Sequence, residues 1–210
     1  VCSDFVDTIE DENGYPLSIE FKNEERFNFA FDVVDALAKR EPEKLAMIHI
    51  DRNKTERRFT FNDMKRRSNQ CANYFKSLGI KRGDRVMLVL KRHYQFWFAI
   101  LGLHKLGAVA IPAPNQLLEK DFKYRFEAGN VKAIICTADG EVASSVDKAS
   151  VECPGLAYKI IVGGNRDGWH SFDDEYSMYS SHFARTSDTP CGSDPMLMFF
   201  TSGTTGYPKM

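Results

Sequence analysis

Long apolar stretches are missing from this sequence. The longest, residues 96–103, falls far short of the ~20 apolar residues that a helix needs to cross a bilayer. A charge excess is missing too, because 28 basic residues are balanced by 29 acidic ones and leave a net charge of −1. Such a balance provides no general attraction to nucleic acid. The sequence therefore predicts a protein with no membrane span and no nucleic-acid partner.

Cysteine spacings typical of zinc sites or disulfide frameworks are also missing. The five cysteines are odd in number and far apart, at positions 2, 71, 136, 153 and 191. None belongs to a C-x-x-C motif, and none is followed by histidine at zinc-finger spacing. No secretory signal peptide opens the sequence. Reduced thiols and a cytoplasmic location are the resulting predictions.

Acidic residues are concentrated at the start of the chain. Residues 1–25 contain eight Asp and Glu residues but a single basic residue, Lys22. A charge run of this kind is usually a solvated extension. We therefore divide the chain into an acidic lead segment, residues 1–26, and a larger region, residues 27–210. The larger region is long enough for one substantial domain.

Strand and helix patterns alternate through the larger region. Apolar residues recur at helical spacing over 27–40, and Thr60 with Asp63 forms a variant of the helix-capping box. Continuous apolar runs such as 86–90 are typical of strands covered on both faces. The predicted strands are 45–50, 58–60, 86–90, 108–111, 133–136, 159–162 and 196–200, and the predicted helices are 27–40, 61–78, 94–106, 119–128 and 141–151. Residues 165–195 are polar and predict a surface excursion with one short helix. The alternation predicts an α/β fold with a mainly parallel sheet and helices on both faces.

The last residues of the chain carry the strongest functional signal. They read Thr201-Ser202-Gly203-Thr204-Thr205-Gly206-Tyr207-Pro208-Lys209 and follow a predicted strand. The glycines let the backbone approach an anion closely, the hydroxyls can donate hydrogen bonds, and Lys209 adds a positive charge. Two residues separate the second glycine from the lysine, so the loop is not a Walker P-loop. The pattern predicts a phosphate-binding loop of another kind.

This loop resembles the phosphate-binding signature of the adenylate-forming superfamily, which includes acyl-CoA synthetases, adenylation domains of peptide synthetases and firefly-type luciferases. Four further stretches, 27–35, 58–61, 83–86 and 106–112, are similar to the amino-terminal region of acetyl-CoA and medium-chain acyl-CoA synthetases. The resemblance implies that a carboxylate reacts with ATP, in the presence of Mg²⁺, to give an acyl-adenylate, whose acyl group then passes to CoA. It also implies that phosphates are held by Thr201, Ser202, Gly203, Thr204, Thr205 and Gly206. Lys209 would then be catalytic, since it would stabilise the β- and γ-phosphates.

The resemblance further implies that much of such an enzyme lies beyond residue 210. In the family, the adenine and ribose motifs, the magnesium-coordinating acid and the catalytic lysine of a small C-terminal domain follow the loop. We therefore expect this chain to be an amino-terminal portion that is inactive alone and whose loop is mobile. Two alternatives stay open, an adenylation domain that loads a carrier protein and a non-catalytic nucleotide-binding module. The sequence predicts neither the acyl chain length nor the oligomeric state.

Few other residues have a pattern that indicates chemistry. His93 lies between a predicted strand and a predicted helix, where it either contacts substrate or nucleotide or lies on the surface at a helix start. His104, inside an apolar helix, is interpreted as a hydrogen-bonded core histidine. The basic groups 57–58 and 65–67 are typical of solvated faces. No acid–base pair, Ser-His-Asp set or metal cluster can be assembled from the sequence.

Overall fold

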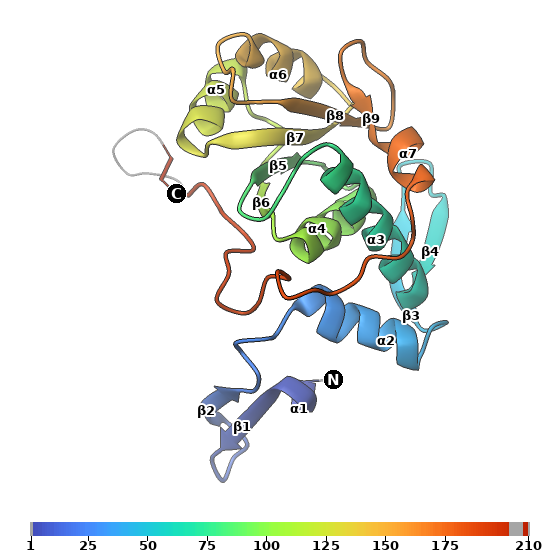
Figure 1. Cartoon of the computed structure of the whole chain (residues 1–210), viewed down its shortest axis with the longest axis vertical. Helices are drawn as coiled ribbons and strands as arrows, with labels where there is room; N and C mark the ends of the chain where they lie inside the picture. The colour runs from blue at the N-terminus through green and yellow to red at the C-terminus, as the bar shows by residue number, and fades with distance from the viewer. Residues whose placement is uncertain (1, 202–207, 210) are drawn as a thin grey trace.

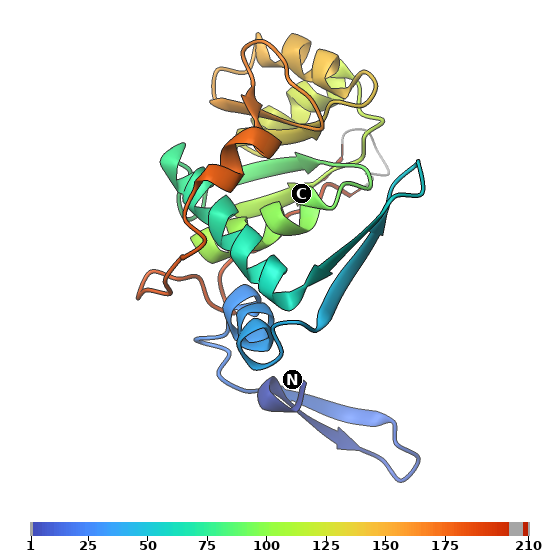
Figure 2. The same cartoon turned by 90° about the vertical axis from the view of Figure 1, so that its right-hand side faces the viewer.

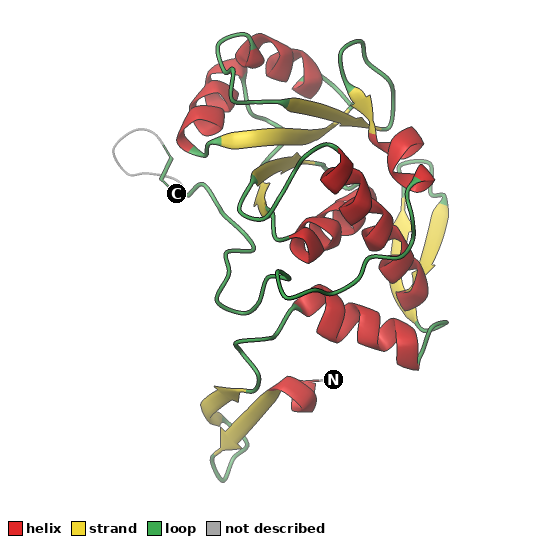
Figure 3. Ribbon diagram, viewed as in Figure 1, coloured by secondary structure: helices red, strands yellow, loops and turns green. Residues whose placement is uncertain are grey.

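A parallel β-sheet forms the centre of the structure (Figures 1 and 3). The computed structural model describes residues 2–201 and 208–209. The strands are β5 (Arg85–Val89), β6 (Val109–Pro112), β7 (Val131–Thr137), β8 (Tyr158–Val162) and β9 (His170–Ser171), in the order β6-β5-β7-β8-β9. All neighbouring pairs in this sheet are parallel. Parallel neighbours need crossover connections, and helices supply most of them here.

Helices cover both faces of the sheet (Figure 1). One face packs against α3 (Phe61–Ser77) and α4 (Gln95–Leu106), and the other packs against α5 (Glu119–Ala128) and α6 (Val142–Ser150). Within the residues that the structure describes, none of the helices has the length and apolar character needed to span a membrane.

Successive residues of β5 point into different cores. Val86 and Leu88 belong to the core beneath α3 and α4, whereas Met87 and Val89 belong to the core beneath α5 and α6. All four side chains are at most 1% exposed. This double burial explains why the sequence of β5 shows no alternation of apolar and polar residues. The predicted α/β fold with a mainly parallel sheet is confirmed.

Local chemistry sets the ends of the helices around the sheet. The Thr60 hydroxyl accepts a hydrogen bond from the Asp63 N–H at 3.2 Å, and the Asp63 carboxylate accepts one from the Thr60 N–H at 3.0 Å. The predicted capping box therefore starts α3. Gly107 ends α4 in the left-handed conformation, with φ at 86°.

Two antiparallel hairpins lie outside the parallel sheet (Figure 2). The first comprises β1 (Val6–Glu10) and β2 (Pro16–Phe21) and follows the short helix α1 (Cys2–Phe5), and the second comprises β3 (Leu45–Ile50) and β4 (Glu56–Thr60). The first hairpin extends away from the rest of the chain, and most of its residues are exposed. It occupies the acidic lead segment, but the proposed boundary between residues 26 and 27 stays a prediction.

The predicted helix over 27–40 is present but begins with a wider turn. Residues Ala30–Asp35 are π-helical, and the α-helix α2 (Ala36–Arg40) continues from them. Apolar spacing predicted where the helix lies and which face it buries. That spacing cannot separate a π turn from an α turn, because the two differ by only one residue in their hydrogen bonds.

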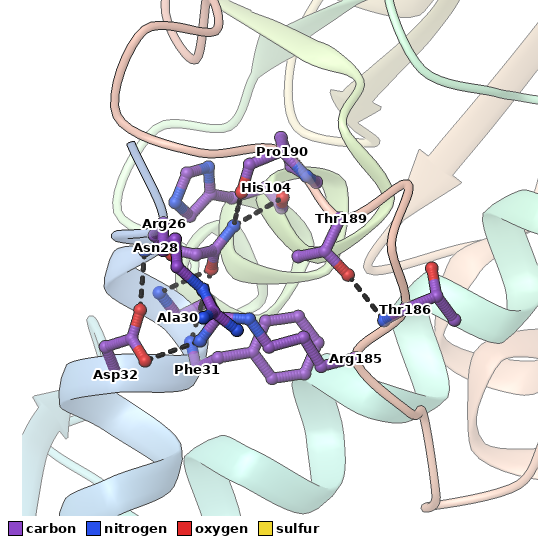
Figure 4. A network of polar contacts seen from close by, with 10 residues as sticks. All are labelled: Arg26, Asn28, Ala30, Phe31, Asp32, His104, Arg185, Thr186, Thr189 and Pro190. Carbon is purple, nitrogen blue, oxygen red and sulfur yellow. Dashed lines mark hydrogen bonds and ion pairs between the residues drawn. The ribbon is translucent and has the colours of Figure 1, made fainter. Parts of the chain in front are cut away.

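A segment far along the chain holds the start of this helix (Figure 4). The Asn28 side chain accepts a hydrogen bond from the Ala30 N–H at 3.1 Å and donates one to the Pro190 carbonyl at 2.9 Å. Nearby, the Arg185 guanidinium lies 2.5 Å from the Asp32 carboxylate. These contacts fix the start of the helical segment over 30–40 against residues 185–190, which sequence patterns did not connect to it.

Part of the predicted surface excursion, 165–195, is core. It contains β9, α7 (Phe172–Glu175) and the 3-10 turn Tyr176–Met178. Phe172 is fully buried and Tyr176 is 6% exposed, with their ring centroids 4.7 Å apart in the core beneath α3 and α4. The expectation was wrong here because two aromatic residues in a polar stretch show no periodicity that reveals burial.

The predicted strand 196–200 is reduced to a single bridge. Leu197 pairs in parallel with Ala110 of β6, and the backbone hydrogen bonds on both sides of it are 3.0 Å long. Leu197 and Phe199 remain 41% and 53% exposed. The segment therefore lies beside β6 without forming the buried strand that we predicted.

Candidate functional site

The predicted phosphate-binding loop is closed at its base by Thr201 and Lys209. The Thr201 N–H donates to the Lys209 carbonyl at 2.7 Å, and the Lys209 N–H donates to the Thr201 carbonyl at 3.0 Å. The Thr201 hydroxyl also donates to the Lys209 carbonyl, at 3.2 Å. The predicted ligands Ser202, Gly203, Thr204, Thr205 and Gly206, and the predicted mobility of the loop, lie outside the described residues.

Helix α5 holds both sides of the loop base. The Tyr124 hydroxyl donates to the Pro208 carbonyl at 2.7 Å. On the other side, the Arg125 guanidinium lies 5.2 Å from the centre of the Phe200 ring, within range of a cation–π contact. The Lys209 side chain is exposed and can extend towards a ligand. The base of the loop is thus anchored while its lysine remains accessible.

A second candidate region is a hollow of about 640 Å³ at the carboxyl ends of the parallel strands. His93, Asn115 and Asp139 enter it from the segments that follow β5, β6 and β7. The remaining lining residues are His49, Ile50, Asp51, Arg52, Asn53, Lys91 and Arg92. Ligands of open α/β sheets bind at this edge, because the loops after the strands converge there.

His93 is a half-buried wall residue of this hollow. Its Nε2 lies 2.7 Å from the Thr137 hydroxyl, and that hydroxyl oxygen accepts a hydrogen bond from the Asp139 N–H at 3.0 Å. Burial lowers the pKa of His93, so its imidazole is neutral at pH 7. His93 thus lines the hollow and also lies just before the start of α4, so both sequence interpretations of this residue stay predictions.

His49 is a functional candidate that sequence reasoning missed. It belongs to β3, and its Nε2 donates to the Arg92 carbonyl at 2.8 Å. Its Nδ1 is buried and has no hydrogen-bond partner among the described residues. No spacing in the sequence could have paired His49 with His93, because three elements, β4, α3 and β5, lie between them.

Positive charge slightly exceeds negative charge in the hollow. Arg52, Lys91 and Arg92 face Asp51 and Asp139. Asp51 is already engaged by Arg57, whose hydrogen bond is the main reason that the pKa of this carboxyl falls to about 2. The exposed cations therefore remain available to an anion, and the lining suits a phosphate-bearing ligand.

The structure does not bring the loop base and the hollow together. The contacts of Thr201, Pro208 and Phe200 involve α5, and a Cβ built on Gly129 would lie 3.4 Å from the Phe200 ring. Figure 1 draws the described residues at the loop base, up to 201 and 208–209, beside the end of α5 and the beginning of β7. The hollow lies at the opposite, carboxyl ends of the strands.

His104 is buried as predicted but is not hydrogen-bonded as predicted. The residue is 8% exposed, and its Nε2 has no partner within the described part of the chain. Burial lowers its pKa to about 4. Three cysteines, Cys71, Cys136 and Cys153, are buried free thiols whose pKa values burial raises. None of these groups is a candidate for catalysis.

Known proteins resemble this chain in sequence over nearly its whole length. Rat (Rattus norvegicus) acyl-coenzyme A synthetase ACSM5, mitochondrial, is 39% identical over 193 residues, which cover 89% of this chain and 33% of the rat protein. The human (Homo sapiens) protein of the same name is 37% identical over 195 residues, with the same coverages. Mouse (Mus musculus) acyl-coenzyme A synthetase ACSM1, mitochondrial, is 33% identical over 208 residues, or 94% of this chain and 35% of the mouse protein. The chain thus spans about a third of the length of these relatives.

Solved structures share the fold. The anthranilate CoA ligase AuaEII in complex with anthranoyl-AMP superimposes with a TM-score of 0.73 at 23% identity and covers 87% of this chain and 34% of that chain. Acyl-CoA synthetase from Brucella canis gives a TM-score of 0.74 at 22% identity, with coverages of 87% and 32%. The profile of the AMP-binding enzyme family matches residues 34–210, which include the loop, the hollow and the whole parallel sheet. The chain therefore belongs to the AMP-binding enzyme family.

Proposed function

We propose that the full-length protein is an AMP-forming acyl-CoA synthetase, an acid–thiol ligase. The observation that carries this proposal is the closed base of the loop, where Thr201 and Lys209 are paired through their backbones. Such a closure suits a loop that wraps an anion and ends on a cation. The relatives described above are all acyl-coenzyme A synthetases, which supports the same reaction class.

Two displacements make up the proposed reaction. A carboxylate oxygen of the substrate attacks the α-phosphorus of ATP, so that an O–P bond forms, the bond to the bridging oxygen breaks and pyrophosphate leaves. The thiol of CoA then attacks the acyl carbon, so that an S–C bond forms, the C–O bond to AMP breaks and AMP leaves with the electron pair. The thiol loses its proton in this second step.

Neutralising the departing pyrophosphate is the proposed task of the loop. Lys209 would stabilise the β- and γ-phosphates, and the Thr201 hydroxyl lies beside it at the loop base. Mg²⁺ is usually held by one or two carboxylates together with substrate phosphates. Within residues 2–201 and 208–209, no group of three or more His, Cys, Asp or Glu side chains is placed to hold a metal ion. The metal would therefore arrive with the nucleotide, and a carboxylate outside this part of the chain would complete its coordination.

The hollow at the carboxyl edge is the proposed place for a second phosphate-bearing substrate. Its cations suit phosphate, and the buried Nδ1 of His49 can accept a hydrogen bond from a ligand. The KM values for ATP and for CoA, measured separately in the Arg92→Gln variant, would show which of the two substrates the hollow binds. We expect one of the two KM values to rise about tenfold, as for loss of one charge-assisted hydrogen bond.

AMP release from the full-length protein tests the proposed reaction. The assay supplies ATP, Mg²⁺, CoA and a panel of carboxylates that covers short, medium and long acyl chains and aryl acids. Aryl acids belong in the panel because one structural neighbour holds anthranoyl-AMP. CoA-dependent AMP release with at least one acid is the expected result.

The panel also separates the alternatives. Pyrophosphate exchange without any CoA dependence would favour an adenylation domain that loads a carrier protein. Nucleotide binding with no exchange for any acid would favour a non-catalytic module. For residues 1–210 alone we expect no exchange above background, because the chain spans about a third of its relatives.

The cytoplasm is the compartment that we propose from the sequence. The names of the relatives include the word mitochondrial, which provides the competing location. Imaging of the tagged full-length protein against markers of both compartments decides between them.

A further inference from the structure

A separate hollow of about 650 Å³ lies where β4, α3, the start of α4 and the segment after α7 meet. It shares no residue with the hollow at the carboxyl edge or with the loop base. Three arginines line it together with aromatic side chains. The complete lining is Arg57, Arg58, Phe59, Arg67, Tyr94, Gln95, Phe98, Asp173, Tyr176 and Ser177.

Arg67 is the arginine of this set that lacks a carboxylate. Arg57 lies 2.9 Å from Asp51, and Arg58 lies 2.6 Å from Glu56, so both are paired. Arg67 instead donates to the Tyr176 hydroxyl at 3.2 Å, and within the described residues no carboxylate oxygen lies within 4.0 Å of it. A half-buried guanidinium whose one side-chain partner is a neutral hydroxyl retains donors that can bind an anion.

Aromatic rings form the wall next to these charges. The Tyr94 ring lies 5.1 Å from the Phe59 ring and 5.5 Å from the Phe98 ring, measured between centroids. The Arg57 guanidinium lies 5.8 Å from the centre of the Tyr94 ring. Such a wall favours a flat apolar group, because rings gain both apolar burial and aromatic contact.

Gln95 adds an unpartnered acceptor to the same lining. Its Nε2 donates to the Asp173 carboxylate at 2.7 Å, and this bond fixes the orientation of the amide. The other atom of the amide, Oε1, is buried and has no hydrogen-bond partner among the described residues. Water does not readily replace that partner, because Gln95 is only 6% exposed. A buried acceptor left unpaired is costly, and a donor on a ligand can satisfy it.

We propose that this hollow is a further ligand site, distinct from the loop and from the hollow at the carboxyl edge, and that it binds a small aromatic anion. The guanidinium of Arg67 binds the carboxylate or phosphate of the ligand, and the Tyr94 wall contacts its ring. A hydroxyl or amino group on the ring would reach Gln95 Oε1. The proposal rests on the lining of this hollow and is independent of the reaction proposed for the loop.

Calorimetric titration of the full-length protein with phenyl phosphate and with benzoate tests the site. We expect Arg67→Gln to weaken binding of the better probe by about 10- to 100-fold, as for loss of a charge-assisted hydrogen bond. Arg66→Gln is the matched control, since Arg66 is an exposed neighbour on α3 that does not line the hollow. The Arg66→Gln variant should bind the same probe with an affinity within about twofold of the wild-type value.

A second variant keeps the test decisive if Arg67→Gln does not fold. Ser177 is exposed at the rim, and Ser177→Glu should weaken binding by repelling the anion. Inorganic phosphate, which has no ring, should bind at least about tenfold more weakly than phenyl phosphate. A comparison of the two aromatic probes shows whether carboxylate or phosphate is preferred.

Three outcomes would overturn the proposal. The first is no binding of either aromatic probe to the wild-type protein at millimolar concentration. The second is binding of phenyl phosphate, which is not a carboxylate substrate, that is equal in the wild-type protein, Arg67→Gln and Ser177→Glu. The third is binding that Lys209→Ala abolishes while Arg67→Gln leaves it intact, because the probe would then occupy only the predicted phosphate-binding loop. AMP release tests the proposed synthetase reaction, and calorimetric binding tests this hollow. A negative result in one measurement therefore does not refute the other proposal.

Discussion

Replacement of Lys105 by methionine tests how a buried charge is held between α3, α4 and the helical segment that contains Asp35. The Lys105 side chain is fully buried in α4, and its Nζ lies 2.7 Å from Asp35 Oδ1 and 2.7 Å from Asn69 Oδ1. The Asn69 amide in turn donates to the Ser181 carbonyl at 2.9 Å. One ammonium group therefore links α4 to α3 and to the π-helical residues Ala30–Asp35, and through Asn69 also to Ser181.

Lys105→Met leaves its partners buried without a donor. The Asp35 side chain is only 13% exposed, so water replaces the lost contact poorly. Removing one member of a buried ion pair typically costs about 3–5 kcal/mol, because the remaining charge is uncompensated. We expect a loss in that range. Lys105→Met with Asp35→Leu removes both charges and should cost less than Lys105→Met alone.

The cost of Lys105→Met should depend on pH. Burial, the larger effect, raises the pKa of Asp35 above its usual range, and attraction to Lys105 opposes that rise. Without Lys105, the pKa of Asp35 rises further. A carboxyl whose folded-state pKa exceeds its unfolded value favours folding at low pH and loses that advantage as pH rises through the folded-state pKa. The variant should therefore be destabilised more at pH 8 than at pH 5.

Native-state hydrogen exchange at the amides of α3 and α4, in the full-length protein, measures this loss locally. Lys76→Met is the control, because Lys76 is exposed on α3 and its loss should cost under about 0.5 kcal/mol. The reasoning is refuted if Lys105→Met costs less than about 1 kcal/mol, or if the double variant costs the sum of the two single ones.

Three further predictions concern the loop, the helix contact and a buried histidine. Lys209→Ala in the full-length protein should lower the pyrophosphate-exchange rate about 10²–10³-fold, and an unchanged rate would remove the role assigned to this lysine. Gly102→Ala places a Cβ 2.7 Å from the Cys71 Cβ and should cost about 1–3 kcal/mol in urea unfolding, whereas Gly155→Ala, with nothing within 4 Å, should cost under about 0.5 kcal/mol. Similar values for the two variants would contradict the close α3–α4 contact. Because burial lowers the pKa of His104 to about 4, the unfolded state takes up the proton first as pH falls, and up to about 3 kcal/mol of stability should be lost between pH 6.5 and 4. His104→Leu should flatten this pH dependence, and an unchanged slope would rule out His104 as its source.

Much of the fold could be predicted because its signals are local. The predicted helix 119–128 has the same bounds as α5, and the predicted capping box starts α3 at Thr60. Gly107 ends α4, because a residue without Cβ adopts a positive φ at low cost. Each of these features depends on residues within a few positions of one another.

Less of the candidate site could be predicted. Thr201 and Lys209 were identified from the order of residue types in one short loop, and their backbone pairing agrees with a closed loop. His49, by contrast, had no neighbour in sequence that indicated a role. It joins His93 only because β3 folds over the carboxyl edge of the sheet. Arg67 was interpreted as part of a solvated face, and only the fold brings aromatic residues around it.

The sequence by itself determined the alternation of strands and helices and the double burial of strands such as β5, and it carries the residue order at 201–209 from which the loop was predicted. These follow from apolar periodicity and from residue types in fixed order, which depend on neighbours along the chain. The tertiary structure alone decided the strand order β6-β5-β7-β8-β9, the burial of Phe172 in a polar stretch and the partners of Lys105. These depend on contacts between residues far apart in sequence, such as Asp35 and Lys105. A one-dimensional pattern shows that a residue must be buried or paired but does not identify its partner.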